Sequence, residues 1–289
     1  MTYTLSTWRL IISPPEKGAW NMALDEAILE NAGNGKSSPT LRLYAWYPPC
    51  LSLGYAQPFN EIDFDRLNQL GWDWVRRPTG GRAILHTDEL TYSVAGPLDE
   101  PRLAGGVLES YRRLSQALLL ALHILGVPAE SHENPPQNTE GKSPSNPAGN
   151  SQIDGNIQPI CFEVPSNYEI TVDGKKLIGS AQARRKDGVL QHGSFPLWGD
   201  LTRITQVLTY SDESKRQNAA ERLLHRATTL ESVLNKPVSW EEAAQAYCSG
   251  FEKALNLQLL LEQPTQTELM RAEALMEEKY INAGWLEKI

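Results

Sequence analysis

A cysteine and a lysine lie about one hairpin apart in the segment 160–194. Two strand-like runs, Tyr168–Val172 and Leu177–Ala181, flank Asp173-Gly174, a dipeptide typical of a tight turn. This pattern predicts that Lys176 begins a strand from which it can reach Cys161. A thiol and an amine held by one rigid hairpin suggest acyl transfer through a thioester. A buried thiol beside surface lysines explains the same residues.

The chemistry assigns a role to each group in this hairpin. A reactive thiol needs its thiolate stabilised, and Lys176 would supply the cation and later exchange a proton with an incoming amine. The N–H groups around Gly179 and Ser180 would stabilise a tetrahedral oxyanion. The other cysteines, Cys50 and Cys248, are predicted to be structural, because one lies beside a strand and the other late in an apolar helix.

A second motif, VRRPTGGRAILH, spans residues 75–86. Gly80-Gly81 after a strand lets the backbone approach a ligand closely, with N–H groups free to face an anion or a carbonyl oxygen. Arg76, Arg77 and His86 add three polar groups to one turn, which favours a binding role. An ordinary hairpin explains the glycines alone, and a lone histidine is more often a core residue than a catalytic one.

The elements that position these motifs alternate without a strict βαβ rhythm, which predicts a mixed α+β fold. Leu108–Leu125 carries a broad apolar face and is the clearest helix. The tail 201–289 is predicted to be helical, with a capping box at Ser239 and Glu242. Glu133–Gln158 is rich in Pro, Gly, Asn and Ser and is predicted to be a disordered insertion. We expect one catalytic domain over residues 1–289.

Composition narrows the class of protein. The net charge of −8 over 289 residues argues against nucleic acid as the main partner, because phosphate binding needs a concentrated basic surface. Three widely spaced cysteines without a CxxC pattern fit a reducing cytoplasm. No apolar run approaches the roughly 18 residues of a membrane span. The sequence has neither GxGxxG nor GxxxxGK[ST]. A soluble, cytoplasmic protein is therefore expected.

Five motifs in one order, RRPTGGRAILH, ELTYSV, CFEVPSNYE, GKKLIGSAQ and LQHGS, together resemble the lipoate–protein ligase A family. Within it, the sequence is most similar to the octanoyltransferase branch of bacilli. The resemblance runs from WNMALDEAIL to the C-terminal helices, with Glu133–Gln158 as the main departure. It implies the biotin/lipoate-ligase catalytic fold, a mixed, mainly antiparallel sheet wrapped by helices.

The resemblance also implies roles for particular residues. Cys161 matches the acyl-thioester nucleophile, and Lys176, rather than Lys175, matches the acyl-site lysine. Many ligases carry TGGG at the turn, whereas Arg82 stands at the third glycine here, which favours the transferase branch. The residues implied to bind substrate are Arg76, Arg77, Gly80, Gly81, His86, Gly179, Ser180 and Ala181.

The implied reaction moves an octanoyl group from acyl carrier protein, through a thioester on Cys161, to a lysine of a lipoyl-domain protein. Acceptors of this kind are the glycine cleavage H protein and the E2 subunits of 2-oxoacid dehydrogenases. No ATP, metal or organic cofactor is implied, because a thioester is already activated. Arg184-Arg185-Lys186 is a candidate docking patch for the carrier.

Two other functions stay open. A lipoate–protein ligase would activate free lipoate with ATP and Mg²⁺ before transfer. A non-catalytic protein that binds lipoyl domains would keep the fold without the chemistry. The presence of both Cys161 and Lys176 speaks against the second of these.

Overall fold

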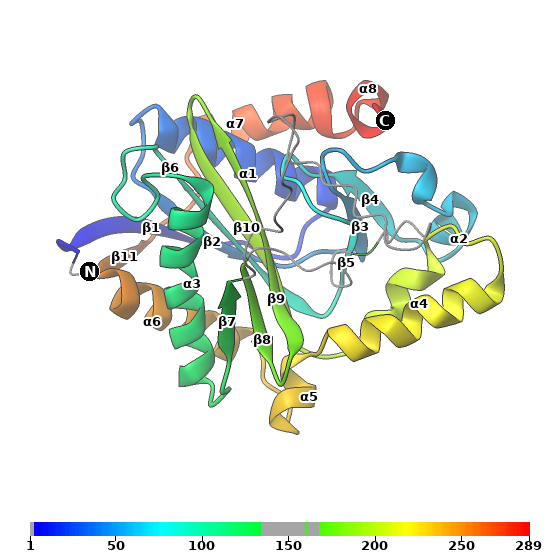
Figure 1. The fold of residues 1–289 in the computed structure, drawn as a ribbon. Coiled ribbons are helices and arrows are strands. Elements are labelled where there is room, and N and C mark those ends of the chain that lie inside the picture. The colour runs from blue at the N-terminus through cyan, green and yellow to red at the C-terminus, as the bar shows by residue number, and fades with distance from the viewer. Residues whose placement is uncertain (1–2, 134–159, 161–167) are drawn as a thin grey trace, which may run out of the picture.

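The computed structural model describes residues 3–133, 160 and 168–289, and Figure 1 shows how their helices and strands are arranged. Within these residues, eight strands form one sheet in the order β11-β1-β2-β6-β10-β9-β8-β7. The pairs β11–β1 and β1–β2 are parallel and the others antiparallel. The strands are β1 (Ser6–Ile12), β2 (Thr40–Tyr44), β6 (Glu89–Gly96), β7 (Glu130–Glu133), β8 (Tyr168–Val172), β9 (Lys175–Arg185), β10 (Gly188–Pro196) and β11 (Leu257–Leu261). This architecture confirms the predicted mixed, mainly antiparallel α+β fold.

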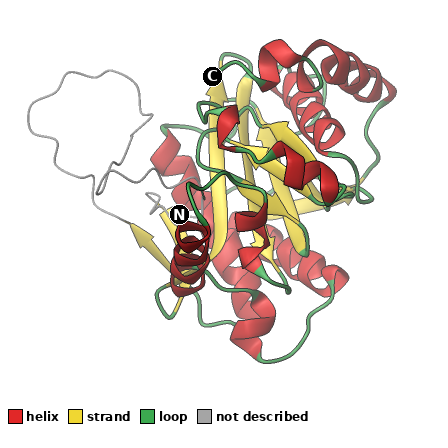
Figure 2. Ribbon diagram, turned by 90° about the vertical axis from the view of Figure 1, so that its right-hand side faces the viewer, coloured by secondary structure: helices red, strands yellow, loops and turns green. Residues whose placement is uncertain are grey.

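A pair of helices covers each face of this sheet, as the turned view in Figure 2 shows. Helix α3 (Val107–Ile124) packs with α6 (Trp240–Leu255) on one face, and α1 (Gly18–Gly33) packs with α7 (Gln266–Leu275) on the other. Successive side chains of β6 point to opposite faces of the sheet, so this strand contributes to the apolar core on each face. Tyr92 joins the cluster beneath α3 and α6, whereas Ala95 joins the cluster beneath α1.

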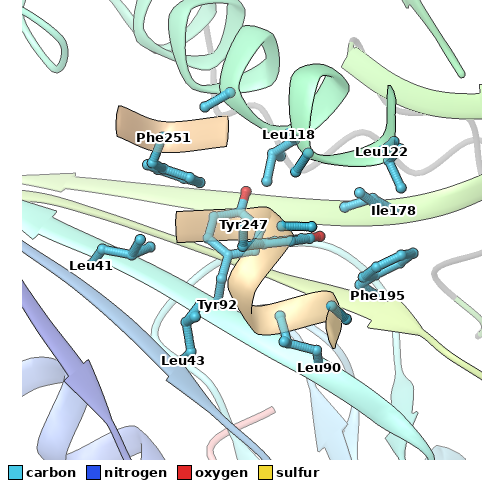
Figure 3. Close-up of a cluster of buried hydrophobic side chains, with 14 of the residues drawn as sticks. Leu41, Leu43, Leu90, Tyr92, Leu118, Leu122, Ile178, Phe195, Tyr247 and Phe251 are labelled. Carbon is cyan, nitrogen blue, oxygen red and sulfur yellow. The ribbon is translucent and has the colours of Figure 1, made fainter. Parts of the chain in front are cut away.

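The middle of the apolar face predicted for residues 108–125 is buried, whereas Leu108 at its start is 48% exposed. Leu118 and Leu122 pack with Tyr247 and Phe251 of α6 in the cluster drawn in Figure 3. The helix begins and ends one residue earlier than predicted. Gly126, with a φ of 83°, follows it in the left-handed conformation that commonly ends helices. No helix in the described part of the chain is both long and apolar enough to span a bilayer.

A smaller sheet of three described strands, in the order β4-β3-β5, stands beside the main one. Its strands are β3 (Cys50–Leu53), β4 (Asp73–Arg76) and β5 (Ile84–His86). A third apolar cluster joins it to η1 (Phe59–Glu61), α2 (Phe64–Gln69), η3 (Leu201–Gln206) and α4 (Glu213–Arg226). Residues 77–83, called the 77–83 turn below, connect β4 to β5.

The C-terminal part is not wholly helical. It contains α5 (Leu230–Leu234), η4 (Met276–Tyr280) and α8 (Ala283–Leu286), with the capping box at Ser239 as predicted. It also contains β11, which the sequence did not reveal and which pairs in parallel with β1. Asn256 ends α6 with a φ of 48°, and this left-handed residue turns the chain into the strand.

The hairpin that carries the lysines forms as predicted. Asp173 and Gly174 both have positive φ, 50° and 74°, which fits the tight turn expected of this dipeptide. Strand β8 has the predicted bounds. Strand β9 continues past Ala181 to Arg185, because β10 pairs with its second half.

Candidate active site

A cavity of about 300 Å³ lies between the main sheet and the 77–83 turn, and most of its surface is apolar. That volume is at the lower end of the range for small-molecule sites. Its walls come from α1, β2, β3, β5, β6, β9, β10 and the turn. The lining residues are Met22, Tyr44, Trp46, Ser52, Arg77, Gly80, Gly81, Arg82, Ile84, His86, Thr91, Lys176, Gly179, Ser180, Ala181, Gln182, His192, Gly193 and Ser194.

A bulge in β9 sets the direction of Lys176. Ile170 of β8 pairs with Ile178, whereas the next residue, Thr171, pairs with Lys176, so β9 has one extra residue at Leu177. Side chains alternate between faces along a regular strand, and one extra residue reverses that alternation. Lys176 therefore lies on the same face as Gly179 and Ala181, and all three line the cavity.

Lys176 is buried and paired. Its side chain is 3% exposed, and its Nζ donates to Oε1 of Glu169 at 2.9 Å. Lys175, the neighbouring residue, instead donates its Nζ to the carbonyl oxygen of Leu224 at the surface. The two lysines thus occupy different environments, and Lys176 alone of the pair lines the cavity.

Arg77 holds the 77–83 turn in place. Its Nη2 donates to the carbonyl oxygens of Gly80 and Arg82 at 2.9 and 2.7 Å. The turn also contacts the end of β3, where a side chain at Gly54 would place its Cβ 1.9 Å from the carbonyl oxygen of Gly81. A glycine is therefore required at Gly54 for this close approach. The turn forms one wall of the cavity because these contacts fix it.

His86 lies at the cavity wall with both ring nitrogens engaged. Its Nε2 is 2.8 Å from Oγ of Ser52, and its Nδ1 is 2.7 Å from Oε1 of Glu89. The ring stacks on Trp46 at a centroid distance of 4.0 Å. Burial alone would raise the pKa of Glu89, but His86 and the hydroxyls of Ser194 and Thr91 outweigh burial and lower that pKa. Glu89 is therefore a carboxylate at neutral pH.

A second buried histidine, His192, lines the cavity from β10. Its Nε2 is 2.6 Å from Oγ1 of Thr79, and its Nδ1 lies 3.8 Å from Oδ2 of Asp25. Asp25 also forms a buried ion pair with Arg42, whose Nη1 donates to Oδ1 at 2.8 Å. Burial alone would raise the pKa of Asp25, but Arg42 and His192 outweigh it and lower the pKa. This charged network supports the cavity from the α1 side of the sheet.

We expect Arg42→Met to lower the free energy of unfolding by about 3–5 kcal/mol, because it leaves the Asp25 carboxylate buried without its cation. Urea unfolding at pH 7 measures this change. Arg66→Met is the control, since the pair between Arg66 and Asp63 is largely exposed and its loss costs at most about 1 kcal/mol. Equal losses in the two variants would contradict the prediction. In the unmodified protein, the stability from Asp25 is present at neutral pH and is lost as the pH falls through its lowered pKa.

Not every residue of the predicted site points into the cavity. Arg76 does not line it: its Nη1 donates to the carbonyl oxygen of Gln57 at 2.6 Å, and its Nε to that of Leu286 at 2.9 Å. The hydroxyl of Ser180 bonds that of Tyr92 on the α3 side of the sheet. Cys161 lies outside the described residues, as does Glu133–Gln158 apart from Glu133 itself.

All the described residues of the predicted site except Arg76 nevertheless come together. Arg77, Gly80, Gly81, His86, Lys176, Gly179, Ser180 and Ala181 all line the one cavity. In the candidate docking patch, Arg185 is already paired with Glu26 at 2.6 Å and Arg184 donates to the carbonyl oxygen of Leu103. The described residues contain no group of three His, Cys, Asp or Glu side chains placed to hold a metal ion.

Sequence reasoning missed several residues of this site, among them Ser52, Trp46, Glu89 and His192. Trp46 and Ser52 stand in strand-like runs without a polar motif around them. His192 belongs to LQHGS, which was noted only as part of a resemblance. The pairing of β10 with β6 and β9 is what brings it to the cavity.

Comparison with known proteins gives a consistent result. The model of the lipoyl protein ligase A/B catalytic domain matches residues 17–252. The chain is 38% identical over 283 residues to the octanoyltransferase LipM of Carboxydothermus hydrogenoformans, covering 98% of this chain and 99% of that one. It is 37% identical over 280 residues to the octanoyltransferase LipM of Bacillus subtilis, covering 96% of this chain and 97% of that one.

Solved structures agree with the family match. A bipartite lipoate protein ligase from Thermoplasma acidophilum superposes with a TM-score of 0.77 at 25% identity, covering 97% of this chain and 96% of that one. A lipoate-protein ligase A bound with ATP superposes with a TM-score of 0.74 at 25% identity, covering 97% of this chain and 98% of that one.

Proposed function

The chain belongs to the lipoyl protein ligase A/B catalytic domain family, and from that premise we propose that it is an octanoyltransferase of protein lipoylation. It takes an octanoyl group from octanoyl-acyl carrier protein as a thioester on Cys161 and delivers it to a lysine of a lipoyl-domain protein. The observation that carries this proposal is the mostly apolar cavity lined by Lys176, in a chain similar over nearly its whole length to octanoyltransferases.

The cavity suits a medium-length acyl chain. Seven carbons of an octanoyl group follow its carbonyl, and burying each contributes about 0.8 kcal/mol, so the tail contributes roughly 6 kcal/mol to binding. The apolar walls supply that term, while the few polar groups at the cavity, such as Lys176 and His86, are held by partners of their own. An acyl tail would meet few polar atoms that lose water on binding.

Lys176 supplies the buried cation of the proposed reaction. Its ammonium group, held by Glu169, would stabilise a Cys161 thiolate and the oxyanion of the tetrahedral intermediate. Ile160, the residue that precedes Cys161 in the chain, forms a bridge with Ala83 between the cavity residues Arg82 and Ile84. That bridge supports a nucleophile at residue 161, because it anchors the preceding residue at the edge of the cavity.

Transfer proceeds in two exchanges in this proposal. The Cys161 thiolate attacks the thioester carbonyl, the bond to the carrier's sulfur breaks, and that sulfur leaves as a thiolate that takes up a proton. The amine of the acceptor lysine then attacks the new thioester, the bond to Cys161 sulfur breaks, and that sulfur leaves as a thiolate that takes up the proton lost by the amine as the amide forms. Both steps start from an activated carbonyl, so we propose that neither ATP nor a cofactor takes part.

We expect octanoyl-acyl carrier protein, without ATP, to add one octanoyl group to each enzyme chain. Intact-mass spectrometry of the enzyme after mixing measures this addition, and hydroxylamine treatment should remove a thioester-linked group. The alternative, favoured by the likeness to a ligase bound with ATP, is a lipoate–protein ligase that needs ATP, Mg²⁺ and the free acid. An enzyme that modifies lipoyl domains only with ATP and free acid would establish the ligase and overturn the transferase.

A further inference from the structure

A continuous row of buried hydrogen bonds joins three side chains at the cavity wall. Glu89, His86 and Ser52 lie at successive distances of 2.7 and 2.8 Å, and all three are at most 5% exposed. The hydroxyls of Thr91 and Ser194 also donate to Glu89, so its carboxylate is held on both oxygens. We call these three residues the Glu89–His86–Ser52 row.

The order of hydroxyl, imidazole and carboxylate is also that of a serine nucleophile with its base. Two observations on Ser52 speak against that role. Ser52 is fully buried, and its Oγ is directed to the His86 ring within the cavity wall. Its Oγ also accepts a hydrogen bond from Nη1 of Arg77 at 3.1 Å. Because a carboxylate only accepts, Nδ1 of His86 carries the proton that is presented to Glu89, and Nε2 shares a hydrogen bond with the Ser52 hydroxyl. Both hydrogen-bond partners of this hydroxyl, His86 and Arg77, therefore lie inside the cavity wall.

The Glu89–His86–Ser52 row ends at Arg77, which is hydrogen-bonded to Ser52 Oγ. Beyond Ser52 Oγ, its guanidinium donates to the carbonyl oxygens of Ser52, Gly80 and Arg82 at distances between 2.7 and 3.2 Å. Its donors therefore link the middle and the end of the 77–83 turn to Ser52 of β3, and Gly80, Gly81 and Arg82 in turn line the cavity. The position of this cavity wall depends on the orientation of one arginine.

We propose that Glu89, His86 and Ser52 are positioning residues that orient Arg77, and through it the 77–83 turn, and that they thereby set the affinity of the cavity for an acyl chain. The row holds Ser52 Oγ as an acceptor aimed at Arg77, and Glu89 fixes the orientation of the imidazole ring that holds Ser52 there. Trp46, stacked on the ring, restricts His86 to one orientation. The inference rests on the proposed function in one respect, which is that the ligand is a medium-chain acyl group.

The test compares octanoate binding, by calorimetry, with the kinetics of octanoyl transfer. We expect Ser52→Ala to raise the Kd for octanoate about tenfold, because Arg77 loses a hydrogen-bond partner. We expect Glu89→Gln to raise it to the same extent, because the His86 ring loses the carboxylate that holds its Nδ1 proton. The KM for octanoyl-acyl carrier protein should rise in parallel, while kcat changes less than about threefold. Ser52→Thr keeps the hydroxyl and should restore the Kd to within about threefold of the unmodified protein.

Thr205→Ala is the matched control, since it removes another buried hydroxyl, one that bonds the carbonyl oxygen of Thr202 away from the cavity. A residue needed only for folding would lower the active fraction, and so the apparent kcat, at unchanged KM. Unchanged octanoate affinity in both Ser52→Ala and Glu89→Gln would overturn the inference. So would labelling of Ser52 by a fluorophosphonate, which would make it a nucleophile.

The same experiment separates this inference from the proposed function. If the unmodified protein binds octanoate and the two variants bind it more weakly, but no octanoyl transfer occurs, only the transferase proposal fails. If transfer occurs and the variants bind octanoate normally, only the positioning role fails. A protein that does not bind octanoate at all would overturn the positioning role as stated.

Discussion

Cys161→Ser is expected to abolish the acyl-enzyme and to lower octanoyl transfer at least about 1,000-fold, as replacing a covalent nucleophile does in other enzymes. The physical reason is that a thiolate forms readily near neutral pH beside a cation, whereas a serine hydroxyl stays protonated and attacks thioesters poorly. Intact-mass spectrometry after mixing with octanoyl-acyl carrier protein measures the first effect. The steady-state rate of modification of a lipoyl domain measures the second.

Cys248→Ser is the matched control for this experiment. Cys248 lies in α6, and burial raises its pKa to about 11, so it carries little thiolate at neutral pH. This variant should form the acyl-enzyme and transfer octanoate at the rate of the unmodified protein. Octanoyl transfer by Cys161→Ser at the rate of the unmodified protein would contradict the thioester mechanism. Loss of acylation in Cys248→Ser would identify Cys248, which we regard as structural, as the nucleophile.

The hairpin could be predicted because its signals are local. Asp173-Gly174 favours positive φ, and strand-like runs flank it on either side, so neighbouring residues alone indicate the turn. The bulge at Leu177 has no such signal. It arises where β9 must pair with β8 on one side and continue along β10 on the other, and that register depends on strands far away in the sequence. The sequence therefore placed Lys176 at the start of a strand but not on a face.

The composition of the site could be predicted only where residues cluster along the chain. The motif at residues 75–86 could be predicted because arginines and glycines stand together there, yet its adjacent arginines, Arg76 and Arg77, have separate roles that depend on tertiary contacts. Arg77 faces the cavity wall, and Arg76 bonds the C-terminal segment at Leu286. Likewise, the pattern LQLLL at β11 is compatible with a helix or a strand, and its parallel pairing with β1 makes it a strand.

Lys176→Met should lower kcat/KM for octanoyl transfer about 100-fold, because it removes the buried cation that we propose to stabilise the thiolate and the oxyanion. Methionine keeps the length and apolar stem of lysine, so the walls of the cavity remain filled. The partner carboxylate of Glu169 is itself partly exposed and can be hydrated, so we expect a folded protein. Transfer kinetics with urea unfolding of the same sample measures both effects.

Lys175→Met makes the comparison decisive, since it removes the same charge from the adjacent residue of the same strand. Lys175 reaches the surface and bonds the carbonyl oxygen of Leu224, so this variant should keep the parent rate within about threefold. A general loss of positive charge would slow the two variants alike, as would a weakened hairpin. Only the face reversal at Leu177, which directs Lys176 and not Lys175 to the cavity, predicts that one lysine matters and its neighbour does not. A Lys176→Met enzyme that is folded and transfers octanoate at the rate of Lys175→Met would refute that assignment.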